Sequence, residues 1–177
     1  HARTGSRVIT VSTTTSRISM TTSNALYFQF ESDFVESLRC IPMQVRYKLD
    51  TCGVKLKLHH WHQFSTEERQ QLVTLPCDQD SDISQYRDHL QSLVVAHTGS
   101  QAKELAIDPT PPWADATQIP SDVQTKLQEV GAALSLEQWQ QLSPLQRFAL
   151  IKLSRPSHEN RNFEPALREF GLSSSLQ

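Results

Sequence analysis

The chain has 177 residues, of which 37% are hydrophobic, so it is long enough for one cored domain but has no apolar run that could span a membrane. The formal net charge is −2, and all the charge ahead of Glu31 is basic, so the rest of the chain is more acidic still. That balance argues against a nucleic-acid surface. Three cysteines without a secretory hydrophobic segment favour a reducing, cytoplasmic environment.

The beginning of the chain differs in composition from the rest. Residues 1–24 are rich in Ser and Thr and have no helical or strand periodicity, so we expect a disordered or non-native N-terminal extension. The acid-poor composition also resembles an organelle transit peptide, and Met20 is an alternative natural start. From residue 25 to 177 we expect a single all-α domain, with weak strand alternation only at 25–30.

Two segments of the chain, 41–75 and 119–153, align without a gap. They read IPMQVRYKLDTCGVKLKLHHWHQFSTEERQQLVTL and IPSDVQTKLQEVGAALSLEQWQQLSPLQRFALIKL. We interpret them as a tandem duplication of a three-helix unit. Each copy has a proline for the first helical turn, a glycine to end the first helix, a tryptophan in the second, and a serine with Glu or Gln three residues later to cap the third. These structural positions are Gly53, Trp61 and Ser65 in the first copy and Gly131, Trp139 and Ser143 in the second.

The segments outside the repeats are also typical of helices. Residues 82–99 place apolar side chains on one helical face and end at a glycine, which predicts a connecting helix. Residues 108–113 read DPTPPW and predict a linker. The sequence FEPALREFG near the end predicts a C-terminal helix.

Three histidines surround the tryptophan of the first copy. His59, His60 and His62 are replaced in the second copy by Glu and Gln, although the neighbouring Leu and Trp positions recur. The architecture therefore does not need imidazoles here. We interpret all three as solvent-exposed histidines rather than as a metal site.

The sequence lacks the motifs of common enzymes. It contains no glycine-rich phosphate-binding loop and no H-E-x-x-H zinc motif, so we predict a protein that is not an enzyme and holds no cofactor or metal. Cys40, Cys52 and Cys77 match no knuckle spacing. A metal or iron–sulfur carrier that uses these three thiols, with His59 or His62, remains the alternative.

A polar loop follows the second copy. Its side chains suit recognition of a protein partner, because guanidinium, imidazole and amide groups form directional hydrogen bonds at interfaces. The competing interpretation is a solvated loop that caps the next helix. The candidate partner-binding residues are Arg155, His158, Glu159, Asn160 and Arg161.

Three blocks of sequence carry a resemblance to a known family. They are FQFESDFVESLRCIPMQVRYKLDTCGVKL, FSTEERQQLVTLPC and LQRFALIKLSRPSHENRNFEPALREFGL. Between about residues 28 and 172 the chain resembles the nitrate reductase-associated protein family of cyanobacteria and some other organisms. The resemblance implies an accessory protein of nitrate assimilation that associates with assimilatory nitrate reductase, a molybdenum enzyme, and supports its activity or maturation. It supplies no catalytic residues.

Overall fold

The computed structural model describes residues 27–32 and 40–172, so the extension predicted for residues 1–24 lies outside the described residues. This part is mainly helical, which confirms the predicted all-α class. The weak alternation at 25–30 does not form a strand where it can be compared, because the chain turns into the 3-10 helix η1 (Gln29–Glu31). There the Glu31 N–H donates to the Phe28 carbonyl at 3.2 Å, a local bond that a strand does not make.

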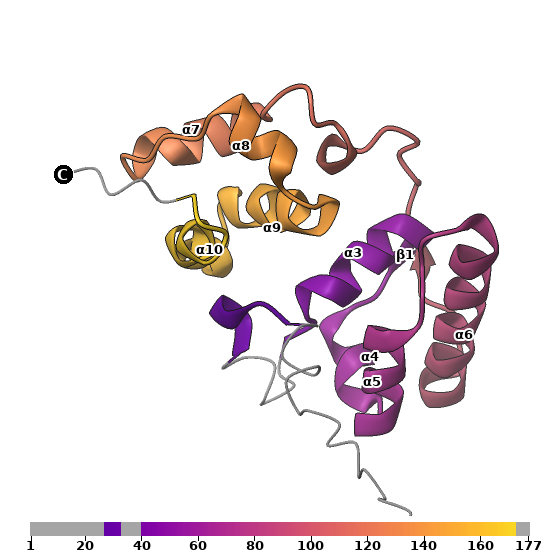
Figure 1. Cartoon of the computed structure of the whole chain (residues 1–177). Coiled ribbons are helices and arrows are strands. Elements are labelled where there is room, and N and C mark those ends of the chain that lie inside the picture. Colours follow the sequence, from indigo (N-terminus) through magenta and orange to yellow (C-terminus); the bar gives the residue numbers. More distant parts are fainter. Residues whose placement is uncertain (1–26, 33–39, 173–177) are drawn as a thin grey trace, which may run out of the picture.

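The helices fall into two groups along the chain (Figure 1). The first group is α3 (Met43–Cys52), α4 (Leu58–Gln63), α5 (Thr66–Thr74) and α6 (Asp80–Thr98). The second group is α7 (Ser121–Glu129), α8 (Leu136–Gln141), α9 (Pro144–Ser154) and α10 (Phe163–Glu169), with the 3-10 helices η2 (Pro112–Ala114) before it and η3 (His158–Asn162) within it. β1 (Val54–Lys55) pairs antiparallel with β2 (Lys103–Glu104), and we call this pair the β ribbon.

The helix boundaries follow from local chemistry. Ser65 accepts a hydrogen bond from the Glu68 N–H at 3.1 Å and its own N–H donates to the Glu68 carboxylate at 2.8 Å. Ser143 and Gln146 form the same reciprocal pair at the start of α9, with bonds of 3.1 and 2.9 Å. Gly53 ends α3 in the left-handed conformation, with φ of 75°.

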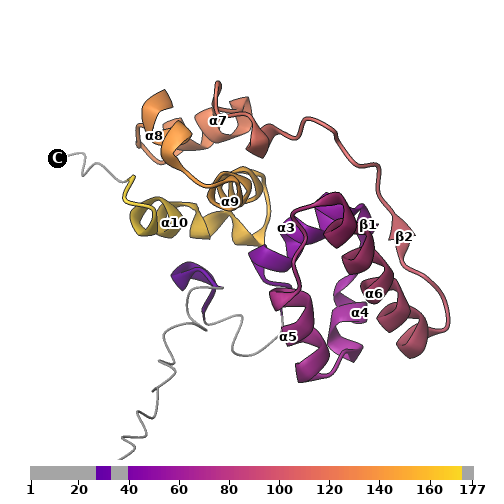
Figure 2. The same ribbon diagram turned by 45° about the vertical axis from the view of Figure 1, so that its right-hand side comes forward.

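Each group of helices encloses its own hydrophobic cluster. Trp61, Leu72 and Leu90 are among the fully buried side chains of the first cluster, and Trp139 and Phe148 are among those of the second. Helix α3 contributes to both clusters, because Met43 and Tyr47 lie on a different side of the helix from Val45, Leu49 and Cys52. Accordingly α3 lies between the two groups, with α6 on one outer side and α7 and α8 on the other (Figures 1 and 2).

Two arginines support the short middle helices. Arg69 donates from Nε to the Trp61 carbonyl at 2.9 Å and from Nη2 to the His62 carbonyl at 3.0 Å. Arg147, which is buried, donates from Nη1 to the Trp139 carbonyl at 3.3 Å and to the Leu142 carbonyl at 2.8 Å. A guanidinium thus adds hydrogen bonds to carbonyls at the end of each six-residue helix, where the regular helical pattern stops.

The prediction of three solvent-exposed histidines is wrong for one of them. His60 is buried, with only 9% of its surface exposed, and its Nδ1 lies 3.1 Å from the Lys57 N–H. The imidazole therefore caps the start of α4, as the Gln138 amide oxygen caps α8 by accepting the Ser135 N–H at 3.0 Å. His59 and His62 are exposed.

Candidate functional site

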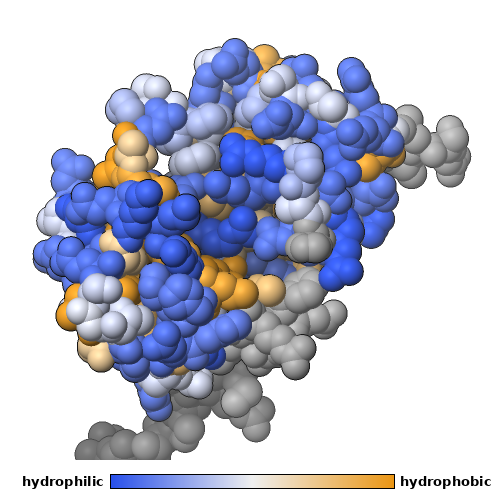
Figure 3. Space-filling view, turned by 180° about the vertical axis from the view of Figure 1, so that it is seen from behind, coloured by the Kyte–Doolittle hydropathy of each residue, from blue (hydrophilic) through white to orange (hydrophobic). Residues whose placement is uncertain are grey.

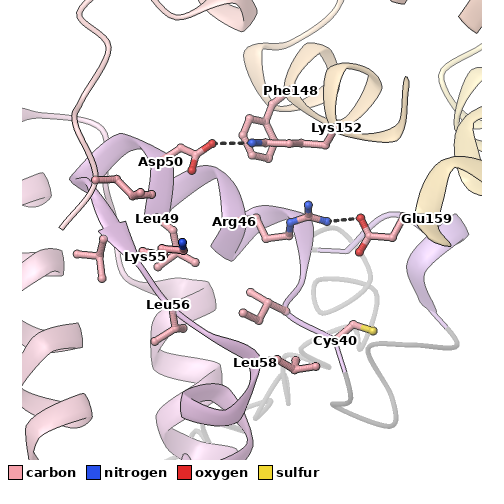
Figure 4. Close-up of a pocket in the computed structure, with 13 residues that line it drawn as sticks. Cys40, Arg46, Leu49, Asp50, Lys55, Leu56, Leu58, Phe148, Lys152 and Glu159 are labelled. Atoms are coloured by element: carbon pink, nitrogen blue, oxygen red, sulfur yellow. Dashed lines mark hydrogen bonds and ion pairs between the residues drawn. The ribbon is translucent and has the colours of Figure 1, made fainter. Parts of the chain in front are cut away.

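A groove lies where α3 meets the second group of helices. Two ion pairs cross from α3 to that group: Arg46 Nη1 to Glu159 Oε2 at 2.6 Å, and Asp50 Oδ2 to Lys152 Nζ at 3.0 Å (Figure 4). Arg46 and Asp50 are one helical turn apart, so they share a face of α3. All four side chains are partly exposed, so the pairs orient the wall of the groove more than they stabilise the fold.

The first hollow of the groove, here called the ribbon hollow, has a volume of about 500 Å³. Leu49, Leu56 and Leu58 approach it from one side, and Phe148 and Lys152 from the other (Figure 4). From behind, the molecule shows a central hollow in which hydrophobic residues lie beside strongly hydrophilic ones (Figure 3). The remaining lining residues are Cys40, Ile41, Arg46, Asp50, Val54, Lys55, Leu105 and Glu159.

A second hollow, of about 440 Å³, adjoins the first and shares Cys40, Ile41, Arg46 and Glu159 with it. Its lining surface is mostly apolar. The residues that line only this hollow are Phe30, Glu31, Pro42, Met43, Leu153, Ser157, Arg161 and Asn162.

A buried carboxylate fixes the start of α3 beside the second hollow. Glu31 accepts the Met43 N–H at 3.0 Å and the Phe28 N–H at 3.2 Å. Pro42, the residue before α3, offers no side-chain cap, so the Glu31 carboxylate takes that role from another segment. Burial raises the pKa of Glu31, while these two N–H donors and the nearby Arg46 lower it in part.

The predicted partner-binding loop is only partly in the groove. Glu159 and Arg161 line the groove. Arg155 is exposed, and its Nε lies 3.9 Å from Oδ2 of Asp122 on α7. Asn160 is half-buried in η3, and the backbone of His158 begins that helix. The loop therefore presents side chains toward two different regions of the surface.

Sequence reasoning missed the charged residues on the opposite wall. Arg46, Asp50 and Lys55 correspond to Gln124, Gln128 and Ala133 in the aligned second segment. The alignment thus already marked these charges as dispensable for the helices. The alignment could not show that Arg46 and Asp50 lie opposite α9 and η3, because the ion pairs that bring them there join residues far apart in the sequence.

The three cysteines do not form a site among the residues that the structure describes. Burial raises the pKa of the Cys52 thiol to about 12 and that of the Cys77 thiol to about 11, so both are neutral at physiological pH. Cys40 is half-buried and lines the groove. Neutral thiols are poor nucleophiles, and within 27–32 and 40–172 no three His, Cys, Asp or Glu side chains cluster as a metal site.

Comparison with known proteins assigns the chain to a family. The fold and groove define a small, mainly helical protein with a mixed apolar and charged surface between its two groups of helices. The chain belongs to the family described as conserved nitrate reductase-associated protein, whose model matches residues 27–170. No match was found among curated proteins or among solved structures. Along the described ranges, no helix combines the length and the apolar character needed to cross a bilayer.

Proposed function

We propose that this chain is a non-enzymatic accessory protein that binds assimilatory nitrate reductase in the cytoplasm and supports its activity or maturation. The observation that carries the proposal is the family match, which spans almost all of the described residues. The groove supports it, because it offers apolar and charged groups for binding a protein partner.

We also propose that the two aligned segments arose by duplication. The starts of α4 and α8, at Leu58 and Leu136, are aligned positions, and so are the capping serines of α5 and α9. Under duplication, polar residues that occur in one segment alone are the better candidates for partner binding. By the same argument, the loop after the second segment, from Arg155 to Arg161, lies beyond what the repeat requires.

The thiol-based metal carrier gains no support from the structure. Within the part of the chain that the structure describes, its proposed thiol and imidazole ligands do not come together with any third His, Cys, Asp or Glu side chain as a metal site.

The loop is tested by the triple variant Arg155→Ala, His158→Ala and Asn160→Ala, expressed as a tagged chain together with nitrate reductase. We expect the helical circular dichroism signal to be retained and co-purification of the reductase to fall. A matched control carries alanine at the exposed α8 residues Glu137, Gln140 and Gln141, and should co-purify normally. Failure of the unmodified chain to retain any reductase would contradict the proposed function.

A further inference from the structure

We propose that the ribbon hollow binds an acidic, apolar segment of the partner: bulky apolar side chains enter the hollow, and neighbouring carboxylates pair with Lys55 and Lys103. This inference rests on the proposed function, because it specifies the chemistry of the segment that the partner contributes.

Exposed hydrophobic side chains at one edge of the groove indicate the apolar part of the ligand. Leu58 is 46% exposed and Leu105 is 38% exposed, and both line the hollow. Ile107, 49% exposed, follows on the same extended segment, which is held against Gly53 by the Leu105 N–H to Gly53 carbonyl bond of 2.8 Å. Large apolar side chains that stay exposed beside a preformed hollow are typical of a binding surface.

The register of the β ribbon indicates the acidic part of the ligand, because it brings two lysines together. Lys55 and Lys103 are directly opposite each other, so their side chains leave the same face of the ribbon. Like charges in this arrangement repel. Neither lysine forms an ion pair with any residue that the structure describes.

The nearest carboxylate on the ribbon does not relieve this repulsion. Glu104 is the next residue along β2, so its side chain leaves the opposite face, where it lines a separate hollow with α6 residues. Lys55 lines the ribbon hollow, and Lys103 lies opposite it on the ribbon without lining the hollow itself. The other two lining cations, Arg46 and Lys152, are already paired. Among the described residues, Lys55 and Lys103 therefore remain without an ion pair at the edge of the hollow, and the complementary ligand carries carboxylates next to apolar groups.

Comparison with the aligned second segment indicates that the fold does not require the charge of Lys55. Leu56 and Leu58 recur as Leu134 and Leu136, whereas Lys55 is replaced by Ala133. The leucines belong to the shared architecture, and the lysine does not. Two cations are also too few for a nucleic-acid surface, where affinity comes from many phosphate contacts.

The first experiment measures binding of short, fluorescein-labelled amphipathic peptides to the purified full chain by fluorescence anisotropy. One peptide combines Leu and Glu, the second replaces Glu by Lys, and the third replaces Leu by Ser. We expect the unmodified chain to bind the Leu/Glu peptide at least about tenfold more tightly than the other two. Equal binding of all three peptides, or no binding of the Leu/Glu peptide, would overturn the inference.

The second experiment reverses the ribbon charge with Lys55→Glu and Lys103→Glu. The variant should weaken Leu/Glu peptide binding about tenfold and improve binding of the Leu/Lys peptide. Arg87→Glu with Arg168→Glu is the matched control: it changes the net charge equally, lies on α6 and α10, and breaks no ion pair among the described residues. The milder pair Lys55→Gln and Lys103→Gln removes the charge if reversal disturbs folding.

Co-purification with nitrate reductase separates failure of the inference from failure of the proposed function. If the unmodified chain retains the reductase and the folded ribbon variants retain it equally, the ribbon hollow is not the partner site and the inference is wrong. If the unmodified chain retains no reductase, the proposed function is wrong, and the inference falls with it as a statement about that partner. Loss of the reductase in the ribbon variants alone supports both.

Discussion

Two glycines at corresponding positions provide a test of how the groove is built. Gly53 and Gly131 both have left-handed backbones, with φ of 75° and 69°. A Cβ added at Gly131 has no neighbour within 4 Å, whereas one at Gly53 lies 2.7 Å from the Leu105 carbonyl oxygen and 2.8 Å from Ile107 Cγ1. Alanine at Gly131 therefore incurs only backbone strain, of about 1 to 2 kcal/mol. Alanine at Gly53 incurs the same strain and must also displace backbone, which adds about 1 to 3 kcal/mol.

The measurement is urea unfolding of Gly53→Ala and Gly131→Ala, followed by far-ultraviolet circular dichroism. We expect Gly53→Ala to lower the free energy of unfolding by about 2 to 5 kcal/mol, a large share of a typical domain's stability. Because Leu105 lines the ribbon hollow, the same variant should also weaken peptide binding. Equal destabilisation by the two substitutions would refute the packing of the 105–107 segment on Gly53.

Three further predictions concern buried side chains. Trp139→Phe should destabilise the protein by about 1 kcal/mol more than Trp61→Phe in urea unfolding. The reason is that Nε1 of Trp139 donates to the Asp115 carbonyl at 3.1 Å, whereas Nε1 of Trp61 has no hydrogen-bond partner among the described residues. Burial lowers the pKa of His60 in the folded protein below its value in the unfolded chain. Its contribution to stability is therefore complete above the unfolded pKa and is lost as the pH falls through the folded pKa. His60→Gln should retain the cap, keep stability at neutral pH, and flatten this acid dependence in thermal unfolding measured over a range of pH. Thiol titration of the native protein should modify Cys40 well before the two buried thiols, and simultaneous modification of all three would contradict their burial.

The helices were predictable because their signals are local. The serine caps and the positive-φ glycines depend on residues only a few positions apart, and the sequence contained both sets twice. The prolines show the limit of this precision: Pro42 and Pro120 lie one residue before their helices, rather than within the first turn.

The groove was not predictable in the same way, since its geometry depends on packing between the two groups of helices. Arg46 and Glu159 are far apart in the sequence, and no periodicity predicts that they meet. Lys48 is a similar case: it is buried, and its ammonium donates to the Val73 and Leu75 carbonyls at 2.6 Å each, although a lysine on a helix is ordinarily expected in solvent. His60 was misjudged for the same reason, because the comparison of the two segments showed that its imidazole was replaceable but not that it was buried.

The central claim is that this chain binds nitrate reductase directly as an accessory protein. The most direct measurement is sedimentation velocity of the purified full chain mixed with purified nitrate reductase. We predict a complex of defined stoichiometry that sediments faster than either component and forms without added metal. Independent sedimentation of the two proteins at all mixing ratios would contradict the claim.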